Sequence, residues 1–246
     1  MSDEILYNTY LRDTESDYGE MLWRYMTLPK YISLIKNKEI WLARADQFED
    51  MQEGRFPDDM KEIIQKAYDG LKDAPGIVAN AEDFADYLKK NTFISCWHKN
   101  TQENIVMWAI YGKSMESVAL QTTVEKLRSS FNPMKIAGNW LDLKKVEYKY
   151  SNEITGVIPY EDCFFIKRPH FQFEYEVRLC LDTYDRRTPS KLHPVGYPLP
   201  ITNVNELIEK VLVHPDSPGW FLDVVRSVNN KYNIKAPVEP GVCGNL

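Results

Sequence analysis

The apolar residues near the start of the chain predict a strand, a helix and a second strand in succession. Residues 22–26 have the short apolar pattern of a strand. Thr27 and Pro29 then mark the start of a helix, since Thr is a common N-cap and Pro fits the first turn. Residues 39–43 alternate apolar and polar positions and predict a second strand, followed by a polar stretch over 44–55 that we expect to be an ordered loop with functional potential.

The rest of the chain alternates helices and strands without a regular order. The patterns predict two helices over 58–88 broken near 75–76, helices over 100–112, from 124 and over 217–230, and strands over 92–97, 116–122, 146–150 and 173–181. Asn100 and Glu103 have the spacing of a capping box. This order predicts a single α+β domain over 1–246, with a mixed or mainly antiparallel sheet covered by helices. Within it we expect 1–20 to be a mobile acidic segment and 237–246 a tail.

Charge and composition exclude several classes of protein. The formal net charge is −6, which argues against binding to extended DNA. The basic residues between Lys126 and Lys149 are interspersed with acids, so we expect a solvated mixed-charge surface there. No apolar run has the length of a membrane span, and four cysteines without tight spacing give no structural zinc site. We therefore expect a cytoplasmic protein with free thiols and no metal site.

Four segments taken in order resemble a known bacterial family. They are Leu22-Trp-Arg-Tyr-Met with Ile35-Lys-Asn-Lys-Glu-Ile-Trp-Leu, Ser95-Cys-Trp-His with Met107-Trp-Ala-Ile-Tyr-Gly, Phe173-Glu-Tyr-Glu-Val-Arg, and Val213-His-Pro. Together they resemble the family catalogued as domain of unknown function 2971, over most of the chain. The resemblance implies one shared domain and brings no assigned reaction.

The segment 173–180 carries the most informative charges. With the period of a strand, Glu174, Glu176 and Arg178 share one face. Such a face is either a solvated salt-bridge ladder or one wall of a cleft, and the sequence leaves both interpretations open.

The order of polar residues along the chain is also similar to that of ADP-ribosyltransferases. In that fold an early strand carries Arg or His, a second carries Ser or Tyr, and a late strand carries a Glu, often within Glu-x-Glu. Arg24, Ser95 and Glu176 follow this order, with Glu174 as the second acid. The resemblance implies NAD as a candidate substrate, with no permanently bound cofactor. It implies that Glu176 stabilises positive charge on the ribose, that Arg24 holds phosphate, that Ser95 supports the site by hydrogen bonding and that Glu174 orients an acceptor.

Further residues complete the candidate site, and some features depart from the pattern. Trp97 and Tyr111 are candidates to stack on nicotinamide, and Tyr25, Lys167 and Arg178 are the remaining candidate substrate-binding residues. The Ser95 segment lacks a Ser-Thr-Ser motif, and Arg178 is close enough to Glu176 to neutralise it. A role in stress or phage defence suits such chemistry by analogy.

Two alternatives remain open. One is a non-catalytic module, in which the basic residues near Lys167 and the loop after Arg44 recognise a protein or an RNA. The other is a metal-dependent nuclease using the Glu147-Tyr-Lys149 segment, where the carboxylate binds Mg²⁺. Such a site needs a preceding acid at the end of another strand, and Asp142 lies too close in sequence to serve. A Lys-rich amphipathic strand is the better explanation of this segment.

Overall fold

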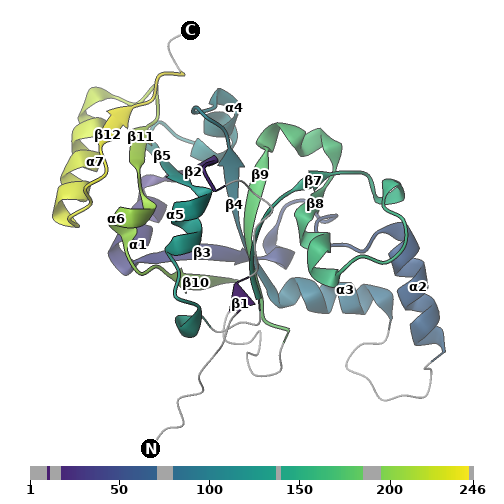
Figure 1. The fold of residues 1–246 in the computed structure, drawn as a ribbon. Helices are drawn as coiled ribbons and strands as arrows, with labels where there is room; N and C mark the ends of the chain where they lie inside the picture. Colours follow the sequence, from purple (N-terminus) through teal and green to yellow (C-terminus); the bar gives the residue numbers. More distant parts are fainter. Residues whose placement is uncertain (1–9, 12–17, 71–79, 137–139, 185–194, 244–246) are drawn as a thin grey trace, which may run out of the picture.

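One large β-sheet organises the molecule (Figure 1). The computed structural model describes residues 10–11, 18–70, 80–136, 140–184 and 195–243. The sheet has ten strands: β1 (Tyr10–Leu11), β2 (Met21–Thr27), β3 (Glu39–Arg44), β4 (Thr92–Lys99), β5 (Ser117–Thr123), β6 (Trp140–Lys145), β9 (Glu176–Asp182), β10 (Gly196–Pro200), β11 (Lys210–Val213) and β12 (Val238–Pro240). The short strands β7 (Glu147–Tyr148) and β8 (Ile166–Lys167) pair with each other.

The strand order places β9, β4 and β2, which lie far apart in the sequence, side by side in the sheet. The main path runs β1-β6-β9-β4-β2-β5-β11-β12, and most pairs are antiparallel; β1–β6 and β11–β12 are the parallel pairs of this sheet. Strand β4 pairs with β9 along one edge from Thr92 to His98. Along its other edge β4 pairs first with β3, at Phe93 and Ile94, and then with β2, at His98 and Lys99. The sheet therefore forks at the middle of β4, and β3 continues into a branch with β10.

Helices cover the sheet in two groups (Figure 1). In the view of Figure 1, α1 (Leu28–Asn37), α5 (Val124–Ser129), α6 (Val204–Leu207) and α7 (Gly219–Lys231) lie on the left, and α2 (Asp58–Asp69) and α3 (Ala81–Lys90) lie on the right. The short α4 (Ile105–Met107) continues into a π-helical turn, η2 (Trp108–Gly112). The 3₁₀ turns are η1 (Ala45–Gln47), η3 (Pro133–Lys135), η4 (Ser151–Glu153), η5 (Tyr160–Phe165) and η6 (Pro169–Glu174).

The two faces of β4 contribute to different hydrophobic clusters. Phe93 and Trp97 belong to the largest cluster, with Leu120, Leu179 and the apolar faces of α1 and α7. Ile94, on the opposite face, belongs to a second cluster beneath α2 and α3. Burial of these side chains supplies the main stabilising free energy, at about 25 cal/mol per Å² of apolar surface. The alternation of β4 therefore separates two environments that matter for the site.

The predicted fold class is confirmed, as are the first strand, helix and second strand. In β3, Ile40 and Leu42 are buried while Trp41 is 48% exposed, as strand alternation requires. Segment 58–88 contains α2 and the larger part of α3, and its predicted break near 75–76 lies outside the described residues. Within the predicted tail, β12 pairs with β11, so residues 238–240 belong to the sheet.

Two local predictions were wrong. The strand predicted over 173–181 begins only at Glu176, because η6 occupies 169–174. The capping box at Asn100 and Glu103 does not form, since Asn104 caps α4 through its side chain and Glu103 accepts instead from Trp108 Nε1. In the described part of the chain, no helix has the length and apolarity to cross a membrane.

Candidate functional site

A closed ring of alternating charges lies under β9. Arg178 Nε donates to Glu176 Oε2 at 2.6 Å, and Arg178 Nη2 donates to Glu53 Oε2 at 2.6 Å. Lys167 Nζ lies 3.0 Å from Glu176 Oε1 and 3.3 Å from Glu53 Oε1. All four side chains are buried, and Arg178 is completely inaccessible to solvent. Two cations and two carboxylates therefore neutralise each other, as burial of charge requires.

A third carboxylate joins this ring from outside the strand. Glu174 Oε2 accepts from Lys167 Nζ at 2.5 Å, and Glu174 is 3% exposed. It is the last residue of η6, and Tyr175 then adopts a left-handed conformation with φ +40° before β9 begins. A non-glycine residue in this region costs about 1–2 kcal/mol and persists where its surroundings stabilise it. This turn brings both glutamates to one ammonium group although only Glu176 lies on the strand.

The two glutamates have opposite electrostatic environments. Burial raises the pKa of Glu174 to about 7, and the neighbouring Glu176 adds to this increase. Burial also acts to raise the pKa of Glu176, but the charges of Arg178 and Lys167 outweigh it and hold that pKa well below the ordinary value. At neutral pH Glu176 is therefore an anion, while Glu174 is poised between its two protonation states.

Aromatic and histidine side chains surround the carboxyl pair. Tyr111 of η2 donates its hydroxyl to Glu174 Oε1 at 2.9 Å, and its ring is 39% exposed. His98 Nδ1 lies 2.6 Å from the backbone carbonyl of Glu174. The Tyr148 hydroxyl accepts from the backbone N–H of Glu176 at 2.8 Å. Tyr111 is thus a partly exposed side chain that is hydrogen-bonded directly to the buried Glu174.

Arg24 and Ser95 belong to the fork of the sheet. Arg24 of β2 donates from Nη2 to the backbone carbonyl of Trp41 in β3 at 2.9 Å, and its guanidinium lies 5.4 Å from the ring centre of Trp97 in β4. Arg24 therefore connects the three strands that meet at the fork. Ser95 is 1% exposed, on the same face of β4 as Trp97.

The structure thus brings the predicted residues together in two groups on opposite faces of the sheet. Residues directly opposite each other on paired strands share a face. Glu176 is paired with His98, and Arg178 with Cys96, whereas Ser95 is paired with Leu179 in the main core. Arg24 shares the face of Trp97. One group is therefore Arg24, Ser95 and Trp97, and the other is Glu174, Glu176, Arg178, Lys167 and Tyr111.

Tyr25 lies on the same face as the second group. Its ring packs edge-on against Trp108 at 4.9 Å, and its hydroxyl accepts from the backbone N–H of Asn104 at 2.8 Å. Its ring centre is 6.4 Å from that of His98. Tyr25 is 7% exposed, so its observed contacts are those of a packed side chain that supports α4 and His98.

A cavity of about 570 Å³ opens beside the ring of charges. Glu53 and Lys167, both ring members, line it, together with residues of α2, α3 and the segment 149–154. Arg168 lies at its rim and pairs with Asp50 at 3.0 Å. The volume is in the range of small-molecule sites, and Glu53 and Lys167 connect it to the carboxyl pair.

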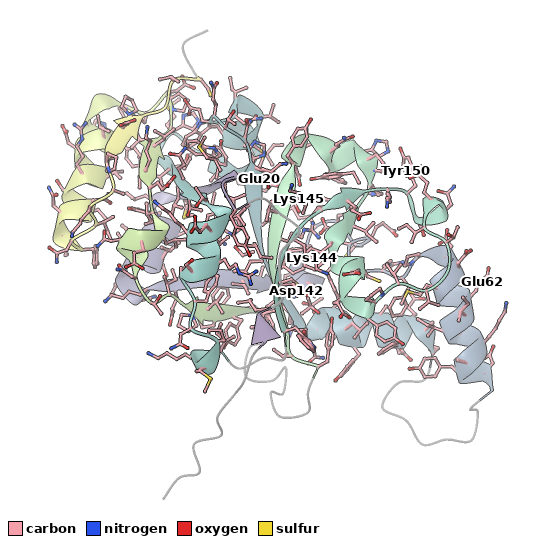
Figure 2. All side chains as sticks on the ribbon, viewed as in Figure 1. Glu20, Glu62, Asp142, Lys144, Lys145 and Tyr150 are labelled. Carbon is pink, nitrogen blue, oxygen red and sulfur yellow. The ribbon has the colours of Figure 1, made fainter. Side chains whose placement is uncertain are left out.

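The basic stretch from Lys126 to Lys149 forms ion pairs. Lys144 pairs with Asp162 at 2.9 Å and Lys145 with Glu20 at 2.8 Å, and Figure 2 shows Lys145 and Glu20 close together beside the central strands. Lys149 pairs with Glu147, and both are about half exposed. This is the mixed-charge surface expected from the sequence. Among the residues that the structure describes, no group of three or more His, Cys, Asp or Glu side chains is arranged to hold a metal ion.

Glu53 is the member of the site that the sequence did not single out. It lies in the polar loop after β3, which was expected to have functional potential, but nothing in its spacing distinguishes it from Asp50 or Glu49. Gly54, with φ +68°, packs against Phe164 and gives the loop its shape at this point. Only this tertiary contact shows which acid of the loop enters the ring.

Comparison with known proteins gives distant structural similarity only. No family model matches the chain, and no curated protein matches it in sequence. Two solved structures are similar, both of DarT from Thermus sp. 2.9. One is in complex with NAD⁺, with a TM-score of 0.37 and 8% identity over 89% of this chain and 94% of that one. The other is in complex with ADP-ribosylated single-stranded DNA, with the same TM-score and identity over 94% and 97%. A TM-score of this size does not establish a common fold.

Proposed function

We propose that the protein is an ADP-ribosyltransferase-like enzyme that cleaves the bond between nicotinamide and ribose in NAD. The observation that carries the proposal is the buried pair of Glu174 and Glu176, whose pKa values are displaced in opposite directions. Two carboxyl groups with separated pKa values are the arrangement that glycosidic bond cleavage uses. One group remains an anion, and the other exchanges a proton near neutral pH.

Each carboxyl group has a distinct role in this proposal. Departure of nicotinamide leaves positive charge on the ribose, and the anionic Glu176 stabilises that charge. Glu174 accepts a proton from the attacking hydroxyl or water, for which a pKa near 7 is suited. Tyr111 is partly exposed and hydrogen-bonded to Glu174, so displacement of its ring admits the substrate to the two carboxyl groups.

The strands also support the proposal through their order. Strands β2, β4 and β9, which carry Arg24, Ser95 and Glu176, are adjacent in the sheet. Arg24 and Ser95 face away from Glu176, so in the proposed enzyme they do not contact the reacting atoms, and Arg24 connects the strands of the fork. Lys167 and Arg178 keep Glu176 ionised through the ring.

The proposal is tested by NAD consumption by the purified protein, with nicotinamide release as the readout. We expect turnover by the wild type and its loss in Glu174→Gln and Glu176→Gln. Since Glu176→Gln also breaks the ring, Tyr111→Phe serves as a variant that leaves all the charges in place. It is expected to fold and to move the pH profile of turnover upwards, because the lost hydroxyl stabilised ionised Glu174. Folded wild type without NAD turnover refutes the proposal.

We extend the proposal to a role in stress or phage defence, by analogy with other enzymes that consume or transfer NAD-derived groups. The test is phage plating on a bacterial host that expresses the wild type or Glu174→Gln. Protection by the wild type alone supports this role. Equal phage plating on both strains refutes the defence role and leaves the proposed reaction untouched.

A second candidate function is a non-catalytic binding module, and the saturation of Glu176 favours it. Both carboxylate oxygens of Glu176 are occupied by cations, and the cavity adjoins the ring rather than the pair itself. Lys149, Lys167 and Arg168 give one wall of that cavity three basic side chains. If NAD is not consumed, a single-stranded RNA oligonucleotide is the next probe. Binding that weakens in Arg168→Glu and is unchanged in Lys36→Glu, on α1, supports the module.

A further inference from the structure

The ring of Glu53, Arg178, Glu176 and Lys167 has a carboxylate that the proposed chemistry does not use. Glu53 is 8% exposed and comes from the loop before α2, far in sequence from β9. It contacts both cations, Arg178 at 2.6 Å and Lys167 at 3.3 Å. A buried carboxylate that contacts two cations reduces the positive charge available to any other anion beside them.

A count of the buried charges shows which carboxyl group is protonated most easily. Three carboxyl groups, Glu53, Glu174 and Glu176, share the two cations Lys167 and Arg178. Full ionisation of all three leaves one uncompensated negative charge in a buried site, which is costly. Arg178 contacts Glu53 and Glu176 directly, whereas among the cations of the described residues Glu174 pairs with Lys167 and not with Arg178. Glu174 is therefore the group on which a proton best removes the excess charge.

We propose that Glu53 is a positioning residue: by pairing with Lys167 and Arg178, it leaves Glu174 as the carboxyl group that holds and exchanges a proton near neutral pH. Its catalytic meaning rests on the proposed function, but the proton equilibrium of Glu174 exists whether or not NAD is the substrate. Glu53 itself touches no reacting atom in this scheme. It acts through Lys167, whose ammonium it shares with Glu174.

The other groups that face Glu174 do not replace this effect. Lys167 on β8 favours its ionised form, and Glu176 on β9 opposes it. Tyr111 on η2 donates a hydrogen bond to its carboxylate, and burial keeps the hydroxyl pKa of Tyr111 above its ordinary value. Tyr148 on β7 and His98 on β4 also lie beside the carboxyl pair. Burial lowers the pKa of His98, so its imidazole is neutral at pH 7. Removal of Glu53 therefore gives Glu174 a larger share of Lys167 without adding another base.

The test is the titration of Glu174 in Glu53→Gln, followed by NMR of protein labelled with ¹³Cδ-glutamate. The resonance is assigned by its absence in Glu174→Gln. We expect the titration midpoint of Glu174 to fall by about one pH unit or more, the scale on which an opposite charge acts on a carboxyl group. Asp50→Asn is the matched control, since Asp50 lies in the same loop and pairs with Arg168 at the rim. Its Glu174 midpoint is expected to stay at the wild-type value.

A second variant tests the inference if Glu53→Gln does not fold. Glu53→Asp keeps the charge but withdraws it by one methylene, and a smaller downward shift is expected. An unchanged midpoint in a folded Glu53 variant overturns the inference. If the midpoint moves and NAD is not consumed, the positioning role stands and the proposed function fails. If both hold, the acidic limb of the pH profile of turnover moves downwards with the midpoint.

Discussion

Glu174 and Glu176 bind the same ammonium group, that of Lys167, at 2.5 and 3.0 Å, yet their pKa values are displaced in opposite directions. The difference arises from Arg178, which bonds to Glu176 and does not reach Glu174. Two glutamates of one short segment thereby become chemically distinct. This asymmetry is the basis of the proposed reaction and of the pH dependence of stability.

Glu174→Gln is expected to stabilise the protein at high pH. Between pH 4.5 and 7 the folded state holds a proton on Glu174 that the unfolded chain releases, so this group's contribution to stability is present below pH 4.5 and is lost as the pH rises to 7. The full loss is about 3 kcal/mol, at 1.36 kcal/mol per pKa unit. Glutamine mimics the protonated acid and removes this loss. Urea unfolding at pH 5 and pH 8 measures the effect, and an equal slope with pH in both proteins contradicts it.

Glu176→Gln is expected to destabilise the protein strongly near neutral pH. The substitution leaves Arg178 and Lys167 buried with fewer compensating charges, and breaking a buried pair costs about 3–5 kcal/mol. Glu147→Gln is the control, because its pair with Lys149 is exposed and solvent screening leaves such pairs little effect on stability. Chemical denaturation of both variants at pH 7 gives the comparison. Similar losses in the two would show that the ring adds no more than a surface pair.

Gly54→Ala is expected to destabilise the protein by about 1–3 kcal/mol and to disturb the ring. A Cβ at this position would lie 2.4 Å from the Phe164 ring, and the backbone has φ +68°. Gly219→Ala at the start of α7 is the control, since a Cβ there meets nothing within 4 Å. That substitution is expected to be neutral or slightly stabilising. Thermal unfolding measures both, and a neutral Gly54→Ala would show that the loop tolerates a different path.

Arg24→Lys is expected to loosen the fork of the sheet. Lysine has a single ammonium group, which cannot both donate to the Trp41 carbonyl and stay over the Trp97 ring as the larger guanidinium does. A loss of about 1–2 kcal/mol follows from one hydrogen bond and one cation–π contact. Arg168→Lys, at an exposed ion pair, is expected to change stability far less. Hydrogen exchange of β3 amides is the sharper readout, and unchanged protection there would refute the role of Arg24 in joining the strands.

Much of the fold was predictable because it depends on local periodicity. The alternation in β3 and the opening strand and helix were recoverable from neighbouring residues alone. The η6 turn was not, because the segment from Phe173 onward alternates as a strand does. What ends the helical turn and starts β9 is the left-handed Tyr175, whose carbonyl accepts from the backbone N–H of Lys99 in the distant strand β4.

The sequence by itself determined the candidate chemistry: a Glu-x-Glu-x-Arg segment, an arginine on an early strand and a polar loop after the second strand. Tertiary structure decided how these residues combine. Strand register placed Ser95 and Glu176 on opposite faces, and loop packing brought Glu53 to Arg178 across 125 residues of sequence. The physical reason is that periodicity assigns a side chain to a face, whereas its partners depend on which strands pair and where. The charge state of Glu174 depends on both, because burial and one shared ammonium group set it together.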